Sequence, residues 1–379
     1  MADDRIGLLI RGAALALAAA LLPRLLATSG AAELWQGGPA QVDLARQVAS
    51  KSLAGVGAND FHTGSARFDG EWAFGTHLMT TLGLGQVALE HPELRAELLP
   101  AMSHAVERML APETNAFGTE AWGNVGLRTL PDGHGHGYLG YANLALSMLR
   151  LVDPQTRFAA LSDELSDAMA SRLAAAPHAL FETYPGEAYA PDMSMVAGSI
   201  ALHDCAAGRA ERPFFPAWRR AFERYIDPAS GLLYQAAEAE TGRPLDAPRG
   251  SGAAIAAYAL SFFDRDLSAR LYDGVRRHAV QPLGFGMMHE YAPGKAGRGD
   301  IDSGPVLLGV GVSATGFALA GARLHRDREQ FTALYRTVNF VGVPLGGHFM
   351  SGGPLGNAIL LAMTSASFEW QKHCRKVSS

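Results

Sequence analysis

A pattern of paired helices that repeats along the chain restricts its fold more than any other feature of the sequence. Apolar stretches end in short polar connectors, each followed by an amphipathic, charged stretch. The connectors are marked by Pro92, Pro154, Asp266 and Asp327 and recur at multiples of about 60 residues. Repeats of this length, each built from two helices, predict stacked helical hairpins.

The expected helices fall into two classes by composition. One class is rich in Gly, Ala and Ser with few charges, and covers residues 71–90, 135–152, 192–207, 250–264, 303–325 and 353–366. The other class is charged on one face with helical periodicity, and covers residues 42–54, 93–110, 157–175, 214–226, 267–280 and 328–340. Helices that are apolar all round belong inside, and one-faced helices belong outside. The alternation of inner and outer helices predicts an all-α fold, an (α/α)6 barrel or toroid.

An open α-solenoid of similar repeat length is the alternative arrangement. In this chain the repeats diverge mainly in the loops that precede the inner helices. Such divergence favours a closed barrel whose loops build one specialised site. We therefore expect a single catalytic domain over residues 33–379.

Composition and charge narrow the class of protein. A chain of 379 residues that is 48% hydrophobic can bury a large core. The formal charge is −5, and no basic cluster or zinc-finger spacing is present, so nucleic acid is not expected as a partner. Cys205 and Cys374 form no CxxC and are too few for a disulfide framework.

The N-terminal residues 1–32 carry a targeting signal. Twelve small and apolar residues lie between Arg11 and Arg24, and small residues at cleavage-site spacing follow. This pattern is typical of a signal peptide or an uncleaved membrane anchor, although a full span needs about 20 residues. A leading helix packed on the domain is the alternative. The pattern favours an exported, periplasmic or membrane-associated protein and leaves a cytoplasmic location open.

The loops before the inner helices are unusually polar. In a barrel all inner helices begin at one end, so these loops converge on one rim. The side chains that we expect there are Asp60, Glu71, Trp72, Trp122, His136, Tyr138, Tyr184, Glu187, Asp192, Tyr291 and Asp302. Carboxylates, imidazoles and phenols whose pKa values respond to burial and to each other suit acid–base catalysis.

Several of these residues also have purely structural interpretations. Asp192 and Asp302 stand where helix N-caps belong. Glu71 and Trp72 could pack in a first helical turn, and Tyr184 could be a buried phenol. The pair His134 and His136 is a weak metal signal because a zinc site needs three or four ligands. No phosphate-binding loop or GxSxG elbow is present, so no metal or cofactor is predicted.

Short motifs, taken in their order along the chain, suggest a family. They are NDF (59–61), VALEHPELR (87–95), FGTE (117–120), GHGYLGYANLALSMLRL (135–151), YPGEAYAPDMSMVA (184–197) and YIDPASGLLYQAAEAETGRP (225–244). In this order the chain, over roughly residues 40–280, resembles the linalool dehydratase/isomerase family. The resemblance implies an (α/α)6 barrel, export, ring-like homo-oligomers, and cofactor-free dehydration or isomerisation of small terpene alcohols.

The resemblance also implies roles for individual residues. Asp60 matches the proton-donating Asp of the family. The family's acid–base His falls on Tyr138, with His136 two residues earlier, and its two active-site cysteines fall on Tyr184 and Met193. The chain thus lacks the family's thiols, which argues against linalool itself as the substrate. Acid–base chemistry would then rest on Asp60, His136, Tyr138, Tyr184, Glu187 and Asp192, with Glu71, Trp72, Trp122, Met193, Tyr291 and Asp302 binding the substrate.

The sequence leads to one main functional hypothesis and two alternatives. The main hypothesis is a cofactor-independent lyase or isomerase of the dehydratase or hydratase type, acting on a small hydrophobic alcohol such as a terpenoid. The first alternative is a carbohydrate-active enzyme, a glycoside hydrolase or lyase, that uses rim carboxylates and stacks sugars on Trp72 and Trp122. The second is a non-catalytic binding scaffold at a membrane. An enclosed apolar cavity would favour the main hypothesis, and an open polar cleft the carbohydrate-active enzyme.

Overall fold

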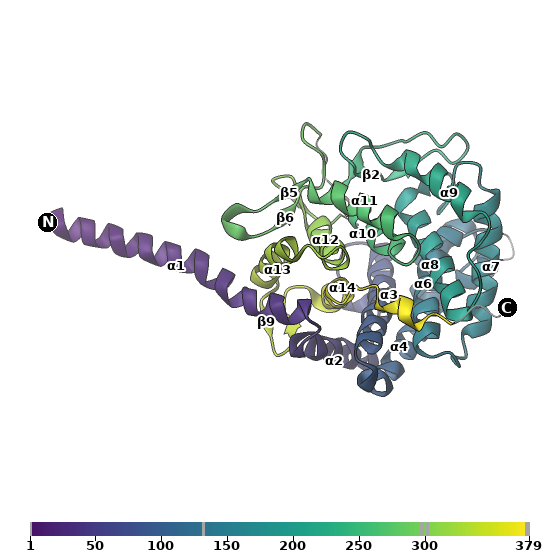
Figure 1. Cartoon of the computed structure of the whole chain (residues 1–379), viewed down its shortest axis with the longest axis horizontal. Helices are drawn as coiled ribbons and strands as arrows, with labels where there is room; N and C mark the ends of the chain where they lie inside the picture. The colour runs from purple at the N-terminus through teal and green to yellow at the C-terminus, as the bar shows by residue number, and fades with distance from the viewer. Residues whose placement is uncertain (1, 131–132, 296, 298, 301–302, 376–379) are drawn as a thin grey trace.

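The computed structural model describes residues 2–130, 133–295, 297, 299–300 and 303–375 (Figure 1). Within these residues the chain is mostly helical, with small two-stranded sheets. The predicted helical class is therefore confirmed.

The apolar helices form the centre of the molecule. They are α3 (Ala66–Glu90), α6 (His136–Val152), α8 (Ala190–Ala207), α10 (Gly250–Leu260), α12 (Val312–Leu324) and α14 (Gly353–Thr364). Each contacts the next in this order, and α14 contacts α3, which closes the circuit. Small residues permit the close approach. A Cβ on Gly198 would lie 2.4 Å from the Ala259 carbonyl oxygen, and one on Gly140 would lie 2.5 Å from Val196.

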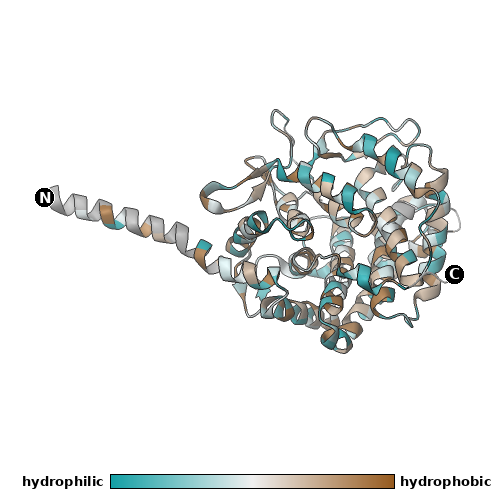
Figure 2. Cartoon of the chain, viewed as in Figure 1, coloured by the Kyte–Doolittle hydropathy of each residue, from teal (hydrophilic) through white to brown (hydrophobic). Residues whose placement is uncertain are grey.

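The charged helices cover this circuit from outside. They are α2 (Pro39–Ala54), α4 (Arg95–Met109), α7 (Ala159–Ala175), α9 (Phe215–Phe222), α11 (Arg265–Arg276) and α13 (Arg328–Gly342). Figure 2 shows hydrophilic colour along α11, whereas the central α14 is largely hydrophobic. Aspartates begin two of these helices, since Asp264 accepts hydrogen bonds from the backbone of α11 and Asp327 from that of α13.

Short antiparallel sheets brace the loops before the inner helices. The pairs are β1 (Ala188–Tyr189) with β3 (Ala236–Ala237), β2 (Leu233–Tyr234) with β4 (Pro248–Arg249), β5 (Ala279–Val280) with β6 (Met287–Met288), β7 (Val306–Leu307) with β8 (Val310–Gly311), and β9 (Pro344–Leu345) with β10 (His348–Phe349). Strands β1, β4 and β8 end directly where α8, α10 and α12 begin. Neither these strands nor α5 (Pro112–Thr119), which packs on α3, was predicted from the sequence.

The N-terminal segment is one continuous helix, α1 (Ala2–Trp35). Its last turns pack on α13 and α2 and bury Ala27, Ala31 and Leu34, whereas its first part extends away from the body (Figure 1). Among the described residues, no helix has both the length and the hydropathy needed to cross a bilayer.

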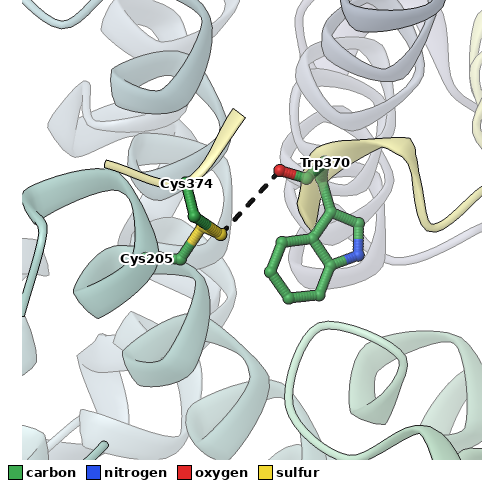
Figure 3. Close-up of a disulfide and its surroundings, with 3 residues drawn as sticks. All are labelled: Cys205, Trp370 and Cys374. Atoms are coloured by element: carbon green, nitrogen blue, oxygen red, sulfur yellow. Dashed lines mark hydrogen bonds between the residues drawn. A yellow bond between two sulfur atoms is a disulfide. The ribbon is translucent and has the colours of Figure 1, made fainter. Parts of the chain in front are cut away.

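A disulfide between Cys205 and Cys374 lies at the opposite end of the helices from the rim (Figure 3). Cys205 is in the last turn of α8, and Cys374 follows the short helix η7 (Glu369–His373). The Arg375 backbone N–H donates to the Cys205 carbonyl oxygen at 3.1 Å. No pairing of the two cysteines was predicted from the sequence, because their separation of 169 residues gives no local signal.

The segment that carries Cys374 crosses the C-terminal ends of several inner helices. Phe368 packs edge-on against His325, which directly follows α12. Trp370 is buried against Phe262, just beyond α10. The segment therefore covers this end of the helical circuit, and the ends with the polar loops lie opposite.

Candidate active site

The first turns of α3, α6 and α8 bring a group of polar side chains together, which we call the Tyr184 cluster. Its members are Arg67 and Glu71 from α3, Tyr138 and Tyr141 from α6, Thr183 and Tyr184 from the loop before α8, and Asp192 from α8. These residues come from three separate repeats. They meet because the three helices begin at the same end of the circuit and are neighbours in it.

Asp192 is held by two hydroxyl donors. Tyr141 donates to Oδ1 of Asp192 at 2.5 Å, and Thr183 donates to Oδ2 at 2.7 Å. The N-cap of α8 is Tyr189, so the interpretation of Asp192 as a helix cap is wrong. Burial raises the pKa of Asp192, and the two hydroxyl donors oppose this shift because they stabilise the charged form. Asp192 therefore keeps its proton to a higher pH than an exposed Asp, as a general acid requires.

Tyr184 stands between charges of both signs. Its ring lies under the Arg67 guanidinium, whose central carbon is 5.0 Å from the ring centroid. Burial raises the pKa of Tyr184, and the carboxylates of Glu71 and Asp192 raise it further, while Arg67 acts in the opposite direction. Both carboxyl groups are thus close enough to this phenol to act on it. At neutral pH Tyr184 is a hydroxyl that can donate a hydrogen bond.

The side chains that pack next to these polar groups are apolar. Tyr138 is buried, packs against the rings of Phe74 and Phe117, and has no hydrogen-bond partner for its hydroxyl among the described residues. Burial, and then the neighbouring Tyr184, raise the pKa of Tyr138. Met193 is fully buried in the hydrophobic core and does not reach the rim. Tyr138 therefore contributes an uncharged phenol within an aromatic cluster.

An aromatic pair borders the cluster. The Trp122 ring stacks on His134 with centroids 4.4 Å apart and an angle of 15° between the planes. The Trp122 indole N–H donates to the carbonyl oxygen of Thr183 at 3.0 Å. Trp122 is only half-buried, so a flat aromatic surface lies next to the residue that binds Asp192.

Two residues predicted to act in acid–base catalysis, Asp60 and Glu187, form hydrogen bonds with residues outside the Tyr184 cluster. The Asp60 carboxylate accepts hydrogen bonds from the Gly57 backbone at 3.0 Å and from Lys51 at 3.3 Å. The Gly57 hydrogen bond lowers the pKa of Asp60, which makes it a poor proton donor at neutral pH. Glu187 is exposed and accepts a hydrogen bond from the Tyr189 hydroxyl at 2.7 Å.

Trp72 also stands apart from the cluster. Trp72 packs edge-on against Phe61, in a small apolar cluster with Val56 and Ala73. Asp302 and the side chain of His136 lie outside the described residues.

Tyr291 belongs to a second group of charges, at the start of α10. Arg249 donates through Nη2 to Asp300 at 2.8 Å and through Nε to Glu290 at 3.0 Å, and its guanidinium lies 5.9 Å from the Tyr291 ring centroid. Burial raises the pKa of Glu290, whereas Arg249 outweighs burial at Asp300 and lowers its pKa to about 2. This group ties the loop after β6 to α10.

Two members of the cluster, Tyr141 and Thr183, were not predicted from the sequence. Tyr141 lies three residues after Tyr138 and so faces the same side of α6, a spacing that could have identified it. Thr183 carried no comparable signal. Within the described part of the chain, no group of three or more His, Cys, Asp or Glu side chains is arranged to hold a metal ion.

Few known proteins resemble this chain among those compared with it. No protein-family model and no curated protein matches the chain. Among solved structures, the chain is similar to a GH76 alpha-mannanase from Bacteroides thetaiotaomicron, determined as a selenomethionine derivative. The TM-score is 0.45 and the sequence identity 8%, over 79% of this chain and 86% of that chain. At this level of similarity no residue role is transferred from that enzyme.

Proposed function

We propose that the chain is an (α/α)6-barrel enzyme that cleaves glycosidic bonds by acid–base catalysis without a cofactor. The observation that carries the proposal is Asp192, a carboxyl with a raised pKa held by Tyr141 and Thr183 at the rim. Asp192 would donate its proton to the glycosidic oxygen as the bond to the sugar breaks. Glu71, the second carboxyl group near Tyr184, would activate a water molecule or attack the sugar carbon.

The character of the surroundings supports a sugar as the substrate. Sugars present both hydroxyl groups and flat apolar faces. The half-buried Trp122 and its stacked partner His134 offer an aromatic surface. Arg67 and the Tyr184 hydroxyl offer hydrogen-bond donors close to Asp192. A partly exposed polar rim of this kind suits a polyhydroxylated substrate better than a fully apolar one.

A lyase or isomerase acting on a small apolar alcohol remains the second candidate. The observation in its favour is the aromatic cluster of Tyr138, Phe74 and Phe117 next to the polar side chains. In this reaction Asp192 would protonate a leaving hydroxyl, and a second carboxylate would take a proton from the neighbouring carbon. The resemblance to the linalool dehydratase/isomerase family motivates this candidate.

One experiment separates the two candidates. The protein is incubated with a panel of polysaccharides and with terpene alcohols, and we measure reducing-end release, unsaturated sugar products and volatile products. We expect reducing ends from at least one glycan, and none from the Asp192→Asn variant. Conversion of alcohols alone, dependent on Asp192, would support the second candidate. Glycan cleavage that survives Asp192→Asn would contradict the assignment of the acid.

The pH profile tests the environment of Asp192. We expect Tyr141→Phe to move the basic limb of kcat/KM upward by about 1–2 pH units, since a hydrogen bond to a charged group contributes about 1.5–3 kcal/mol. The reason is that Tyr141 stabilises the ionised carboxylate, so its removal raises the pKa of Asp192 further. Tyr189→Phe, which removes the hydrogen bond to Glu187, is the matched control and should leave the limb in place.

We also propose that the protein works in an oxidising compartment outside the cytosol. The Cys205–Cys374 disulfide supports this, because such bonds persist in secreted and periplasmic proteins. The apolar stretch between Arg11 and Arg24 is consistent with export. Fractionation of the producing cells, with thiol counting of the isolated protein, tests the proposal, and a reduced protein in the cytosolic fraction would contradict it.

A further inference from the structure

A cavity of about 300 Å³ lies between α2, α3, α14 and strand β10, apart from the Tyr184 cluster. Its α3 wall includes Thr76 and His77. Thr76 follows Arg67 by nine residues, which is two and a half helical turns, so the two side chains leave opposite faces of α3. The cavity therefore lies farther along α3 than the cluster, and none of the cluster residues lines it.

Buried polar atoms without partners line this cavity. His77 is 1% exposed and Ser52 is 3% exposed. Among the described residues, no hydrogen-bond partner is found for either ring nitrogen of His77, for Oγ of Ser52, or for Nδ1 of His348. All three residues line the cavity. A buried polar group without a partner costs about 1–3 kcal/mol, so a ligand in this cavity that supplied partners to these groups would recover that cost.

The ionisation state of His77 defines what it can bind. Burial lowers the pKa of His77 to about 4. The Val56 backbone approaches the ring and opposes this shift, although its geometry falls short of a hydrogen bond. At neutral pH the ring is therefore uncharged, with one nitrogen that donates and one that accepts. Such a ring suits a hydroxyl group.

The remaining walls are mostly apolar and held in place. Val48, Phe349 and Pro354 contribute side chains to them. The Asn357 side chain fixes the β10 wall, since its Oδ1 accepts from the Phe349 backbone N–H at 2.7 Å and its Nδ2 donates to the Phe349 carbonyl oxygen at 2.8 Å. Lys51 also borders the cavity, and its ammonium is paired with Asp60 at 3.3 Å. Its charge therefore does not require an anionic ligand.

We propose that this cavity binds a small, uncharged, mostly apolar alcohol. The hydroxyl of the alcohol donates to a ring nitrogen of His77 and accepts from the Ser52 hydroxyl, while its apolar body lies against Val48 and Phe349. This is a second binding site, additional to the proposed glycosidase site, and it requires no catalytic step.

The test uses benzyl alcohol as the probe and toluene as its counterpart without a hydroxyl. Met350 lines the cavity, so its methyl resonance in protein labelled with [methyl-13C]methionine reports on binding. A Met350→Leu variant assigns the resonance. We expect benzyl alcohol to shift it in a saturable manner, and His77→Leu or Ser52→Ala to weaken that binding at least tenfold. Toluene should bind weakly, and the same substitutions should not weaken it further.

Two further measurements distinguish loss of alcohol binding from unfolding and from loss of glycan cleavage. His77→Leu replaces an unpaired buried imidazole with an apolar side chain, so we expect its melting temperature to be retained. Asp192→Asn should bind benzyl alcohol like the unmodified protein, so loss of glycan cleavage does not affect this test. No shift at Met350, or equal binding of toluene and benzyl alcohol that is insensitive to His77→Leu, would overturn the proposal.

Discussion

Asp192→Asn is expected to lower kcat for glycan cleavage by about 10²–10⁴-fold, the contribution typical of a positioned general acid. Asparagine keeps the size of the side chain and an oxygen that can accept from Tyr141 or Thr183, but it has no acidic proton to donate. The loss should therefore appear in kcat, with KM little changed. Steady-state kinetics on the best glycan of the panel measures it.

Two controls separate a catalytic effect from unfolding. Glu187→Gln changes an exposed carboxylate of the same rim, one that accepts a hydrogen bond from the Tyr189 hydroxyl, and should retain activity. The second control is the dependence of the protein's stability on pH. Because the folded protein raises the pKa of Asp192, the stability it contributes is present below the unfolded pKa and is lost as pH rises through the folded pKa.

This sign predicts the behaviour of the Asp192→Asn variant. Its amide side chain has no charge to bury, so the melting temperature of the variant relative to the unmodified protein should increase as the pH is raised from about 4 toward 8. Loss of activity accompanied by a lower melting temperature at pH 8 would indicate a structural role for Asp192 and count against its assignment as the acid.

Removal of the disulfide is expected to produce the largest change in stability. The double variant Cys205→Ser and Cys374→Ser should lose about 5 kcal/mol of unfolding free energy by the chain-entropy model, because the bond closes a loop of 169 residues. Urea denaturation of the double variant and of the oxidised protein measures the difference. Reduction of the unmodified protein is a second route to the same state and should give a similar loss.

A loss of unfolding free energy smaller than this would show how the disulfide acts. If reduction lowers the unfolding free energy by less than about 1 kcal/mol, the unfolded chain already holds the two cysteines near each other or the oxidised form is strained. The contacts of Trp370 with Phe262 would then hold the C-terminal segment without the covalent bond. That result would contradict an important stabilising role for the disulfide.

The alternation of inner and outer helices was predictable because the two kinds of helix differ in amino-acid composition. Helix α14 consists mainly of apolar residues, whereas α11 carries charged side chains along its length. Asp327 lies in a connector between repeats and is also the N-cap of α13. The small sheets were not predictable, since strands of two residues leave no alternating pattern to detect. Their positions depend on contacts between loops far apart in the chain.

The candidate site was predictable only in part. The stretch from Tyr184 to Asp192 was recognised by its polarity, and these two residues share one cluster. Asp60 and Glu187 have the same chemistry in the sequence, yet Asp60 binds the backbone of Gly57 three residues away and Glu187 binds Tyr189. Sequence shows which groups are present near the rim. The sequence does not show whether such a group forms a hydrogen bond with a residue close to it in the chain, as Asp60 and Glu187 do.

The disulfide also determines how the protein would respond to a mechanical load. Tension applied between α2 and Arg375 would pass through the sulfur–sulfur bond and leave the intervening segment slack. Only α2, α3, α4, α5, α6, α7, α8 and their loops could be drawn out. The 169-residue loop from Cys205 to Cys374, a contour of roughly 560–610 Å, would stay shielded until a reductant reached the bond. A single bond at the end opposite the rim would thus protect nearly half of the chain from extension by force.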